Sequence, residues 1–199
     1  MVRRKVEKKL IAITGGIGSG KSAVSSIIKQ MGYPVISADE MVEKLYKKRS
    51  FLVKIKRLFP TAVKGIVKLS VDKSEIAKIV FSDSQKLKML NQLIHPSVMS
   101  EGLKRLKKEN ARLAFMEVPL LFEGAYQNLF DEVIVVLRDI EGRILSVISR
   151  SSLTREQVLE RISNQIDYAE KDFSEYRVIL NDGDKNALSQ KVVALIKQI

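Results

Sequence analysis

The feature that most constrains this chain is the glycine-rich segment Gly15-Gly16-Ile17-Gly18-Ser19-Gly20-Lys21-Ser22. It follows the short apolar run Leu10–Thr14, which is typical of a buried strand. After it, residues 21–31 carry Val24, Ile27, Ile28 and Met31 at helical spacing, and Gly32 follows as a helix stop. A strand, a GxxxxGK[ST] turn and a helix in this order are the pattern and the context of a phosphate-binding loop.

The glycines allow the backbone to fold closely around a phosphate, so that N–H groups point inward. The helix beginning at Lys21 adds the positive end of its dipole. We expect Lys21 to reach the β- and γ-phosphates of ATP, and the Ser22 hydroxyl to ligate Mg²⁺. The candidate ATP-binding residues of this segment are Gly16, Gly18, Ser19, Gly20, Lys21, Ser22 and Ala23. A GxGxxG dinucleotide pattern does not occur.

Four more short apolar runs, near residues 34–37, 112–118, 133–137 and 177–180, predict strands. Helical patterns over 141–150, 154–171 and 185–199 alternate with them, and residues 39–110 have an all-helical pattern. Because the runs are apolar on both faces, the sequence predicts an α/β fold with a five-stranded, doubly wound parallel sheet. We expect a single domain over 1–199, with a core of 8–38, 111–140 and 176–199 and helical regions at 39–110 and 141–175.

Composition excludes several classes of site. The chain has no Cys and one His, so it cannot form a disulfide framework, a thiolate zinc site or a multi-histidine metal site. The apolar run Leu10–Ile13 is shorter than the roughly 7 to 15 residues of a signal-peptide core. No window approaches the ~20 apolar residues of a membrane helix. We therefore expect a cytoplasmic protein with no membrane partner.

The net charge of +12 indicates an anionic partner. Ten Lys or Arg residues and a single acid, Asp72, lie between Lys44 and Lys73. This stretch is either a solvated surface or a wall facing a polyanionic substrate. Its aromatic residues are few, which argues against a platform for stacking nucleic-acid bases.

The phosphate loop by itself is compatible with kinases, GTPases and mechanical ATPases. No NKxD-type segment of a GTPase is present, and motor ATPases usually need more than 199 residues. A small-molecule kinase is the economical interpretation. A kinase for another small molecule or a nucleoside monophosphate is one alternative. In another class, the charge leaves open a basic, nucleotide-dependent RNA- or DNA-binding switch.

Five segments resemble the dephospho-CoA kinase family: ITGGIGSGKS, SADE, VFSD, LIHPSV and VPLLFE. The resemblance runs from Leu10 to about Gly183, and its specific part is the His-Pro pair followed by PLLFE. It implies a P-loop kinase fold with a helical substrate-binding region and a lid. It also implies ATP- and Mg²⁺-dependent phosphorylation of the ribose 3′-hydroxyl of dephospho-CoA, the last step of CoA synthesis. We expect a monomer or weak homo-oligomer with no nucleic-acid partner.

Asp39 follows the second predicted strand, at the sheet edge where α/β proteins bind ligands. The resemblance implies that its carboxylate is the catalytic base for the acceptor hydroxyl; the alternative is an N-cap for a helix starting near Glu40. The family commonly has Asp-Ala-Asp here, whereas this chain has Ser37, and Glu43 stands where the family has an arginine.

Glu117 ends the third predicted strand, where an acid could hold Mg²⁺ through water. The resemblance makes His95 a substrate-binding residue; the alternative is that it caps the next helix, because Pro96 disfavours helical geometry at His95. The segment after Glu117 is unusually apolar for a loop. Its residues Pro119, Leu120, Leu121 and Glu123 are expected to form either core or one wall of the dephospho-CoA pocket.

In the lid, the resemblance implies that Arg150 is the catalytic arginine that neutralises charge on the transferred group. The family often has a second arginine four residues earlier, where this chain has Ser146. By the same resemblance, Asn181 lies against the adenine of ATP, and the basic stretch lies near the pyrophosphate and pantetheine arm of the acceptor.

Overall fold

The computed structural model describes residues 8–65 and 69–199. The chain divides into two compact units. The first, here the sheet unit, comprises residues up to Ser37 and Arg105–Ile199, and the second, the helical unit, comprises Ala38–Lys104. Within the described part of the chain, no helix is both long and apolar enough to cross a membrane.

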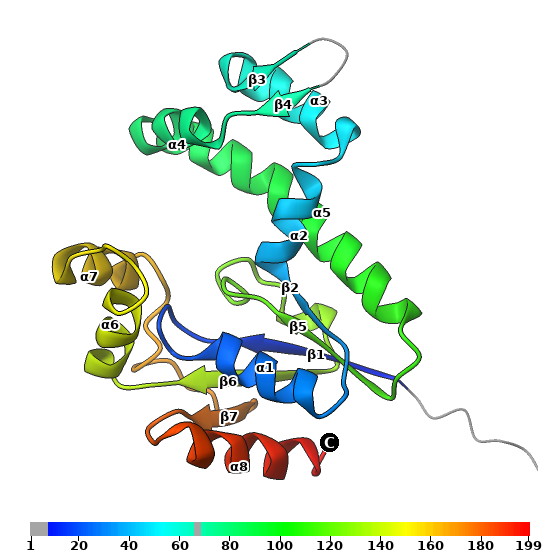
Figure 1. Cartoon of the computed structure of the whole chain (residues 1–199), viewed down its shortest axis with the longest axis vertical. Coiled ribbons are helices and arrows are strands. Elements are labelled where there is room, and N and C mark those ends of the chain that lie inside the picture. The colour runs from blue at the N-terminus through cyan, green and yellow to red at the C-terminus, as the bar shows by residue number, and fades with distance from the viewer. Residues whose placement is uncertain (1–7, 66–68) are drawn as a thin grey trace, which may run out of the picture. The chain divides into compact units, whose positions relative to one another are not determined.

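The sheet unit contains the expected five-stranded parallel sheet (Figure 1). Its strand order is β2-β5-β1-β6-β7, and every neighbouring pair is parallel. The strands are β1 (Lys9–Thr14), β2 (Val35–Ser37), β5 (Leu113–Glu117), β6 (Glu132–Leu137) and β7 (Arg177–Leu180). The helices of the unit are α1 (Lys21–Gln30), α6 (Ile140–Ile148), α7 (Arg155–Ser163) and α8 (Lys185–Ile196), with a 3₁₀ turn at Gln127–Leu129.

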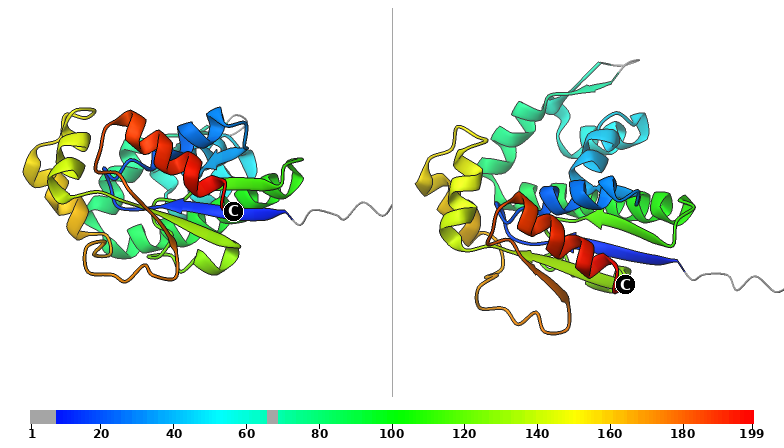
Figure 2. Two further views of the ribbon diagram at one scale, coloured as in Figure 1. Left: turned by 90° about the horizontal axis from the view of Figure 1, so that it is seen from below. Right: turned by 60° about the horizontal axis from the view of Figure 1, so that its bottom comes forward.

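The central strands are buried on both faces, as their continuous apolar runs predict. One face carries Ile11, Ile13, Phe115 and Ile134, which pack against the apolar sides of α1 and α8. Figure 2 shows these two helices on the same side of the sheet, and the segment between α7 and β7 on the other side. Because all five strands are parallel, their carboxyl ends share one edge, which carries the phosphate loop, Glu117 and Asn181.

Helix starts in this unit follow local side-chain chemistry. Asp139, Thr154 and Asp184 directly precede α6, α7 and α8. Each side chain accepts a hydrogen bond from the backbone N–H three residues later. These caps satisfy N–H groups that have no partner inside the helix, so the helices begin where the sequence places a capping residue.

The helical unit contains α2 (Ala38–Leu45), α3 (Arg49–Leu58), α4 (Lys73–Ser82) and most of α5 (Ser84–Lys108). The expectation that residues 39–110 are entirely helical is wrong. A 3₁₀ turn at Pro60–Ala62 leads into β3 (Val63–Lys64), which pairs antiparallel with β4 (Ser70–Val71). Strands of two residues are too short to show an alternating pattern, so the sequence carried no signal for them.

The interior of α5 also corrects a sequence-based expectation. His95 and Pro96 both lie within this 25-residue helix, so His95 does not cap a following helix. A proline in a helix removes one N–H donor. Burial of Ile94, Val98 and Met99 around this position stabilises the helix against that loss.

The helix predicted over 154–171 ends earlier, at Ser163. The following segment is irregular because two aspartates bond their own backbone: Asp167 accepts from the N–H of Ala169, and Asp172 from the N–H of Ser174, each at 2.8 Å. Aromatic rings hold this segment to the loop after β5, with Phe122 lying 5.5 Å from Phe173 between ring centroids. Residues 141–175, the expected lid, thus belong to the sheet unit.

Candidate active site

The turn between β1 and α1 has the geometry of a phosphate-binding loop. Gly15, Gly18 and Gly20 all have positive φ, at 146°, 77° and 99°. At Gly20, which immediately precedes α1, a Cβ atom would lie 2.3 Å from Nδ2 of Asn181. At Gly15 it would lie 2.2 Å from the carbonyl oxygen of Val136. Only glycine satisfies both the backbone conformation and the available space at these positions.

The side chains of Lys21 and Ser22 both point to groups at the sheet edge. Lys21 is 9% exposed, and its Nζ donates to the carbonyl oxygens of Gly15 at 2.7 Å and Gly16 at 2.9 Å. The Ser22 hydroxyl donates to Oε1 of Glu117 at 2.8 Å. Glu117 ends β5 and lies opposite Ile13 of β1 in the sheet register, so strand pairing brings its carboxylate to the start of α1.

This pair of oxygen-bearing side chains fits a magnesium ion. Mg²⁺ prefers oxygen ligands and is usually held by one or two carboxylates together with substrate phosphates. The hydroxyl of Ser22 and the carboxylate of Glu117 supply such oxygens next to the loop. In residues 8–65 and 69–199, no group of three or more His, Cys, Asp or Glu side chains could hold a metal alone. The loop therefore suits a cation that arrives with a phosphate ligand.

Asp39 lies where the chain leaves the sheet. Ser37, the last residue of β2, pairs with Glu117 in the register, and Asp39 follows two residues later in the first turn of α2. The alternative role as an N-cap of a helix starting near Glu40 is wrong, because α2 already begins at Ala38. An acid in the first turn still benefits from the positive end of the helix dipole, which favours the ionised carboxylate.

The apolar segment after β5 contains both buried and exposed residues. Leu121 is completely buried and belongs to the core, whereas Leu120 is 37% exposed. Glu123 is exposed, and its Oε1 accepts a hydrogen bond from the N–H of Ile166 at 3.2 Å. Pro119 is partly exposed. Leu121 therefore fits the core interpretation, and a wall of the dephospho-CoA pocket stays a prediction for the more exposed residues of the segment.

Asn181 holds the phosphate loop in place. Its backbone N–H donates to the carbonyl oxygen of Leu137 at 2.8 Å, and its Nδ2 donates to the carbonyl oxygen of Ser19 at 2.8 Å. The side chain is almost fully buried. The residue predicted to contact adenine thus links the end of β7 to the end of β6 and to the loop. The sequence carried no signal for this role, because it depends on three separate segments meeting.

The arginine that the structure places on the loop is Arg143, which the sequence reasoning missed. Arg143 lies in α6, is 7% exposed, and donates from Nε to the carbonyl oxygen of Ile17 at 3.0 Å. Arg150, the predicted lid arginine, is exposed just past the end of α6. The available signal was that Arg143 lies four residues before Val147, which is on the buried face of the same helix.

Burial also affects the titration of side chains near the loop and in the helical unit. It raises the pKa of Tyr168 to about 12, with a further contribution from Glu123, so this phenol is neutral at physiological pH. Burial lowers the pKa of His95, which is therefore neutral at pH 7. A neutral imidazole offers one donor and one acceptor nitrogen, which suits binding of a polar substrate group.

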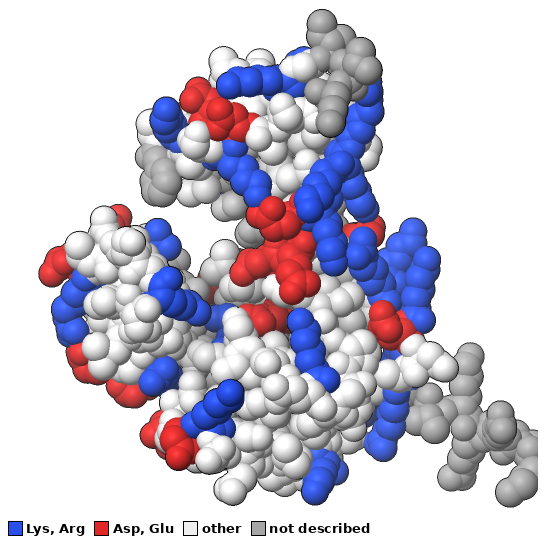
Figure 3. Space-filling view, in the orientation of Figure 1, with Lys and Arg blue, Asp and Glu red and all other residues white. Residues whose placement is uncertain are grey.

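The basic stretch of the helical unit lies on α2, α3 and the segments beside them. Figure 3 shows Lys and Arg side chains gathered along α3, whose basic residues are Arg49, Lys54, Lys56 and Arg57. Glu43, which replaces the arginine of the family pattern, forms an ion pair with Lys73. Lys68 of the same stretch lies outside the described residues.

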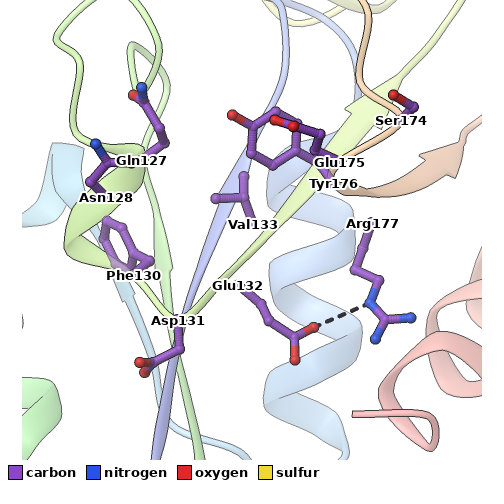
Figure 4. A pocket seen from close by; sticks show the side chains of 10 residues that line it. All are labelled: Gln127, Asn128, Phe130, Asp131, Glu132, Val133, Ser174, Glu175, Tyr176 and Arg177. Carbon is purple, nitrogen blue, oxygen red and sulfur yellow. Dashed lines mark hydrogen bonds and ion pairs between the residues drawn. The ribbon is translucent and has the colours of Figure 1, made fainter.

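A separate cavity of about 610 Å³ lies at the opposite edge of the sheet, where β6 and β7 begin (Figure 4). Its lining includes Phe130, Tyr176 and the ion pair between Arg177 Nε and Glu132 Oε2 at 3.2 Å. None of the residues predicted from the sequence lines it. The cavity is therefore not part of the candidate active site.

Comparison with known proteins agrees with this geometry. A sequence model described as dephospho-CoA kinase matches residues 9–187. The chain belongs to the dephospho-CoA kinase family. A dephospho-CoA kinase from Thermus thermophilus is 35% identical over 190 residues, covering 96% of this chain and 91% of that relative. The family resemblance predicted from the sequence is thereby confirmed.

Solved structures extend the similarity to the fold. A crystal structure of a Thermus thermophilus protein superposes with a TM-score of 0.82 at 34% identity, covering 97% of this chain and 98% of the other. Dephospho-CoA kinase from Campylobacter jejuni superposes with a TM-score of 0.70 at 29% identity and 96% coverage of both chains. The predicted P-loop kinase fold is confirmed. As a member of this family, the protein is a dephospho-CoA kinase. It is a phosphotransferase that uses ATP and has an alcohol group as acceptor.

Proposed function

We propose that this kinase transfers the γ-phosphoryl group of ATP to the ribose 3′-hydroxyl of dephospho-CoA, with Mg²⁺, to give CoA and ADP. The observation that carries the proposal is the loop Gly15–Ser22 with Ser22 bonded to Glu117 at 2.8 Å, in a chain whose family match covers residues 9–187. The loop suits the triphosphate, and the family match supports the acceptor.

The loop residues bind and orient the triphosphate. The backbone N–H groups of Gly18, Gly20 and Lys21 and the start of α1 offer donors to the phosphates, whereas those of Ile17, Ser19 and Ala23 donate within the protein. Lys21 exchanges the carbonyl oxygens of Gly15 and Gly16 for phosphate oxygens, because a charged acceptor binds an ammonium more strongly than a neutral carbonyl. Ser22 and Glu117 would hold Mg²⁺, which supplies positive charge to the β- and γ-phosphates.

Asp39 acts on the acceptor. As a carboxylate in the first turn of α2, it accepts the hydrogen bond of the 3′-hydroxyl and takes its proton as the hydroxyl oxygen attacks phosphorus. Lys21 and Arg150 stabilise the charge on the transferred group, with Arg150 supplied by the exposed end of α6. No covalent enzyme intermediate is involved.

The remaining acceptor contacts come from His95 and the segment after β5. His95 is neutral at pH 7 and half-buried, so it can hydrogen-bond a polar group of dephospho-CoA without carrying charge. Leu120 and Pro119 provide exposed apolar surface, Leu121 supports them from the core, and Glu123 supplies a polar contact. Asn181 keeps the loop in place beside the adenine.

The test measures ADP release with ATP and Mg²⁺, with and without dephospho-CoA, for the wild type, Asp39→Asn and Glu40→Gln. We expect dephospho-CoA to stimulate ADP release strongly. Asp39→Asn should lower kcat by about 10²- to 10⁴-fold, the usual contribution of general base catalysis. Glu40→Gln removes a carboxylate from the same helix turn and should retain activity.

Two results would contradict the proposal separately. Stimulation by AMP or a sugar in place of dephospho-CoA would show that the acceptor is wrong. Full activity of Asp39→Asn would not affect the assignment of dephospho-CoA as the substrate, but it would show that Asp39 is not the catalytic base.

We further propose that the kinase acts in the cytoplasm as a monomer or weak homo-oligomer, without nucleic-acid or membrane partners. Its substrates, ATP and dephospho-CoA, are small water-soluble anions. The basic surface can attract these substrates, so its charge does not require a nucleic-acid partner. Light scattering after gel filtration measures the oligomeric state. RNA binding that collapses steeply between about 50 and 200 mM salt would contradict the absence of a nucleic-acid partner.

A further inference from the structure

Arg143 is a buried cation packed on the phosphate loop. It is 7% exposed, and its Nε donates to the carbonyl oxygen of Ile17 at 3.0 Å. A Cβ atom at Gly16 would lie 2.4 Å from its Nη2, so the guanidinium lies directly against the loop backbone. All of these residues belong to the sheet unit.

No carboxylate contacts this guanidinium within the described part of the chain. Its Nη2 is buried and has no hydrogen-bond partner there, and no Asp or Glu oxygen lies within 4 Å of it in residues 8–65 and 69–199. Tyr168 and Asp167 interact with it electrostatically without a direct hydrogen bond or ion pair in the described residues. Arginine is not deprotonated in proteins, so this buried charge has no carboxylate in direct contact within the described residues, which is costly.

Ile17, the loop residue that Arg143 contacts, is held in place by several interactions that do not involve Nη2 of Arg143. The N–H of Ile17 donates to Oε1 of Gln165 at 2.7 Å, while its carbonyl accepts from Arg143. The Ile17 side chain packs against the apolar cluster formed by Ile144, Val147 and Val158. Because Ile17 is anchored at both backbone groups and at its side chain, Arg143 is oriented relative to the loop before any ligand binds.

A second unsatisfied group lies in the same place. The hydroxyl of Ser19, within the loop, is buried and has no hydrogen-bond partner in the described residues. Native proteins seldom leave buried polar atoms unpaired, and such atoms at a binding loop indicate a partner that arrives with the ligand. For a cationic donor at a phosphate-binding loop, the matching partner is a phosphate oxygen.

We propose that Arg143 is a catalytic residue of this kinase: Nη2 donates a hydrogen bond to a phosphate oxygen of bound ATP while Nε keeps its bond to Ile17. The phosphate is thus the counter-ion that the buried guanidinium lacks. The inference rests on the proposed binding of ATP at the loop. The arginine that contacts the phosphates from the side of the loop is then Arg143, which precedes the exposed Arg150 by about two helical turns.

The experiment measures binding of ATP and of AMP by calorimetry, and thermal unfolding without ligand, for the wild type, Arg143→Gln, Arg143→Lys and Arg155→Gln. AMP lacks the β- and γ-phosphates. Arg155 is the control, because it is an exposed arginine of the adjacent helix whose ion pair with Glu141 is solvent-exposed.

We expect Arg143→Gln to weaken ATP binding about 10- to 100-fold, the range of a lost charge-assisted hydrogen bond, and to leave AMP binding nearly unchanged. The unfolding temperature without ligand should not fall, because the substitution removes a buried charge that no carboxylate contacts in the described residues. Arg143→Lys, which keeps the charge but not the fork, should bind ATP with intermediate affinity. Arg155→Gln should resemble the wild type.

Two results would overturn the inference. Wild-type ATP affinity in Arg143→Gln would show that no phosphate contact exists. A lower unfolding temperature with equal losses for ATP and AMP would make Arg143 a structural support of the loop. If the wild type itself did not bind ATP, the proposed function would fail first, and the two failures are therefore distinguishable.

Discussion

The phosphate loop and the helical unit organise their charges differently. In the loop, Lys21, Glu117 and Arg143 are buried, and each makes at least one defined hydrogen bond. In the helical unit, ion pairs such as Lys73 with Glu43 and Lys64 with Asp72 lie at the surface. The phosphate loop therefore holds its charged groups in fixed positions before a ligand binds, whereas the charged groups of the helical unit are solvated.

The difference follows from what each region has to do. Phosphoryl transfer depends on charges held at defined positions, since preorganised groups need no rearrangement as charge develops. Attraction of an anionic acceptor requires only a field, which exposed lysines provide and salt screens. Substitutions in the loop should therefore have large effects that do not depend on salt, and substitutions in the helical unit small effects that do.

The largest effect is expected for Lys21→Met. Removing the loop ammonium should lower kcat/KM by at least about 10³-fold, because the β- and γ-phosphates lose a charge held in place for them. Steady-state kinetics at two salt concentrations measures it, with the exposed Lys29→Met in the same helix as control. Equal losses in both variants would mean that net charge, not position, is what matters.

Gly20→Ala should have the next largest effect. Its φ of 99° disfavours a side chain, and a Cβ would lie 2.3 Å from Nδ2 of Asn181, which holds Ser19. We expect a loss of about 1–3 kcal/mol in the free energy of unfolding and at least tenfold in kcat/KM for ATP. Denaturant unfolding and kinetics measure both quantities.

Gly32→Ala is the matched control for this substitution. Gly32 has a similar φ of 89°, but a Cβ added to it would meet no neighbouring atom within 4 Å. It should therefore show the backbone cost alone, about 1 kcal/mol, with unchanged kinetics. Identical behaviour of the two variants would refute the claim that crowding at the loop matters.

The double variant Lys54→Gln/Arg57→Gln tests the helical unit, since both side chains are exposed on α3. We expect KM for dephospho-CoA to rise about two- to fivefold at low salt, with KM for ATP unchanged, and the difference to vanish near 0.5 M salt. Lys107→Gln/Lys108→Gln, at the end of α5, removes the same charge and should leave KM unchanged. A salt-independent change would argue for fixed contacts.

The smallest effect concerns the pH dependence of stability. Because burial lowers the pKa of His95 in the folded state, the unfolded chain binds its proton first as the pH falls. The contribution of this neutral histidine is complete above about pH 6.5 and is lost as the pH falls through the folded pKa. His95→Gln should therefore flatten the loss of stability below pH 6.5, as measured by urea unfolding between pH 5 and 8. A steeper loss in the variant would reverse the sign assigned here.

Local signals predicted much of this protein. The strand-loop-helix pattern around Gly15–Ser22 is contiguous, so the loop could be located from the sequence, while the roles of its residues and the magnesium site at Ser22 and Glu117 stay predictions. The five parallel strands followed from runs that are apolar on both faces. The predictions were wrong in two kinds of place. Strands β3 and β4 have only two residues each, too few for a sequence pattern, and at Pro96 the burial of neighbouring side chains outweighs the local preference of proline against a helix.

The sheet, the phosphate loop and the family could all be predicted from the amino-acid sequence, because each depends on residues that are neighbours along the chain or repeat at regular spacing. The side chains that contact the loop from distant segments became known from the folded chain. Asn181 is 162 residues from Ser19, and Arg143 is 126 residues from Ile17. No local pattern records such pairings. They arise because the parallel strands bring the ends of β6, β7 and β1 to one edge of the sheet. A buried polar group there is hydrogen-bonded either by another part of the chain or by a bound ligand.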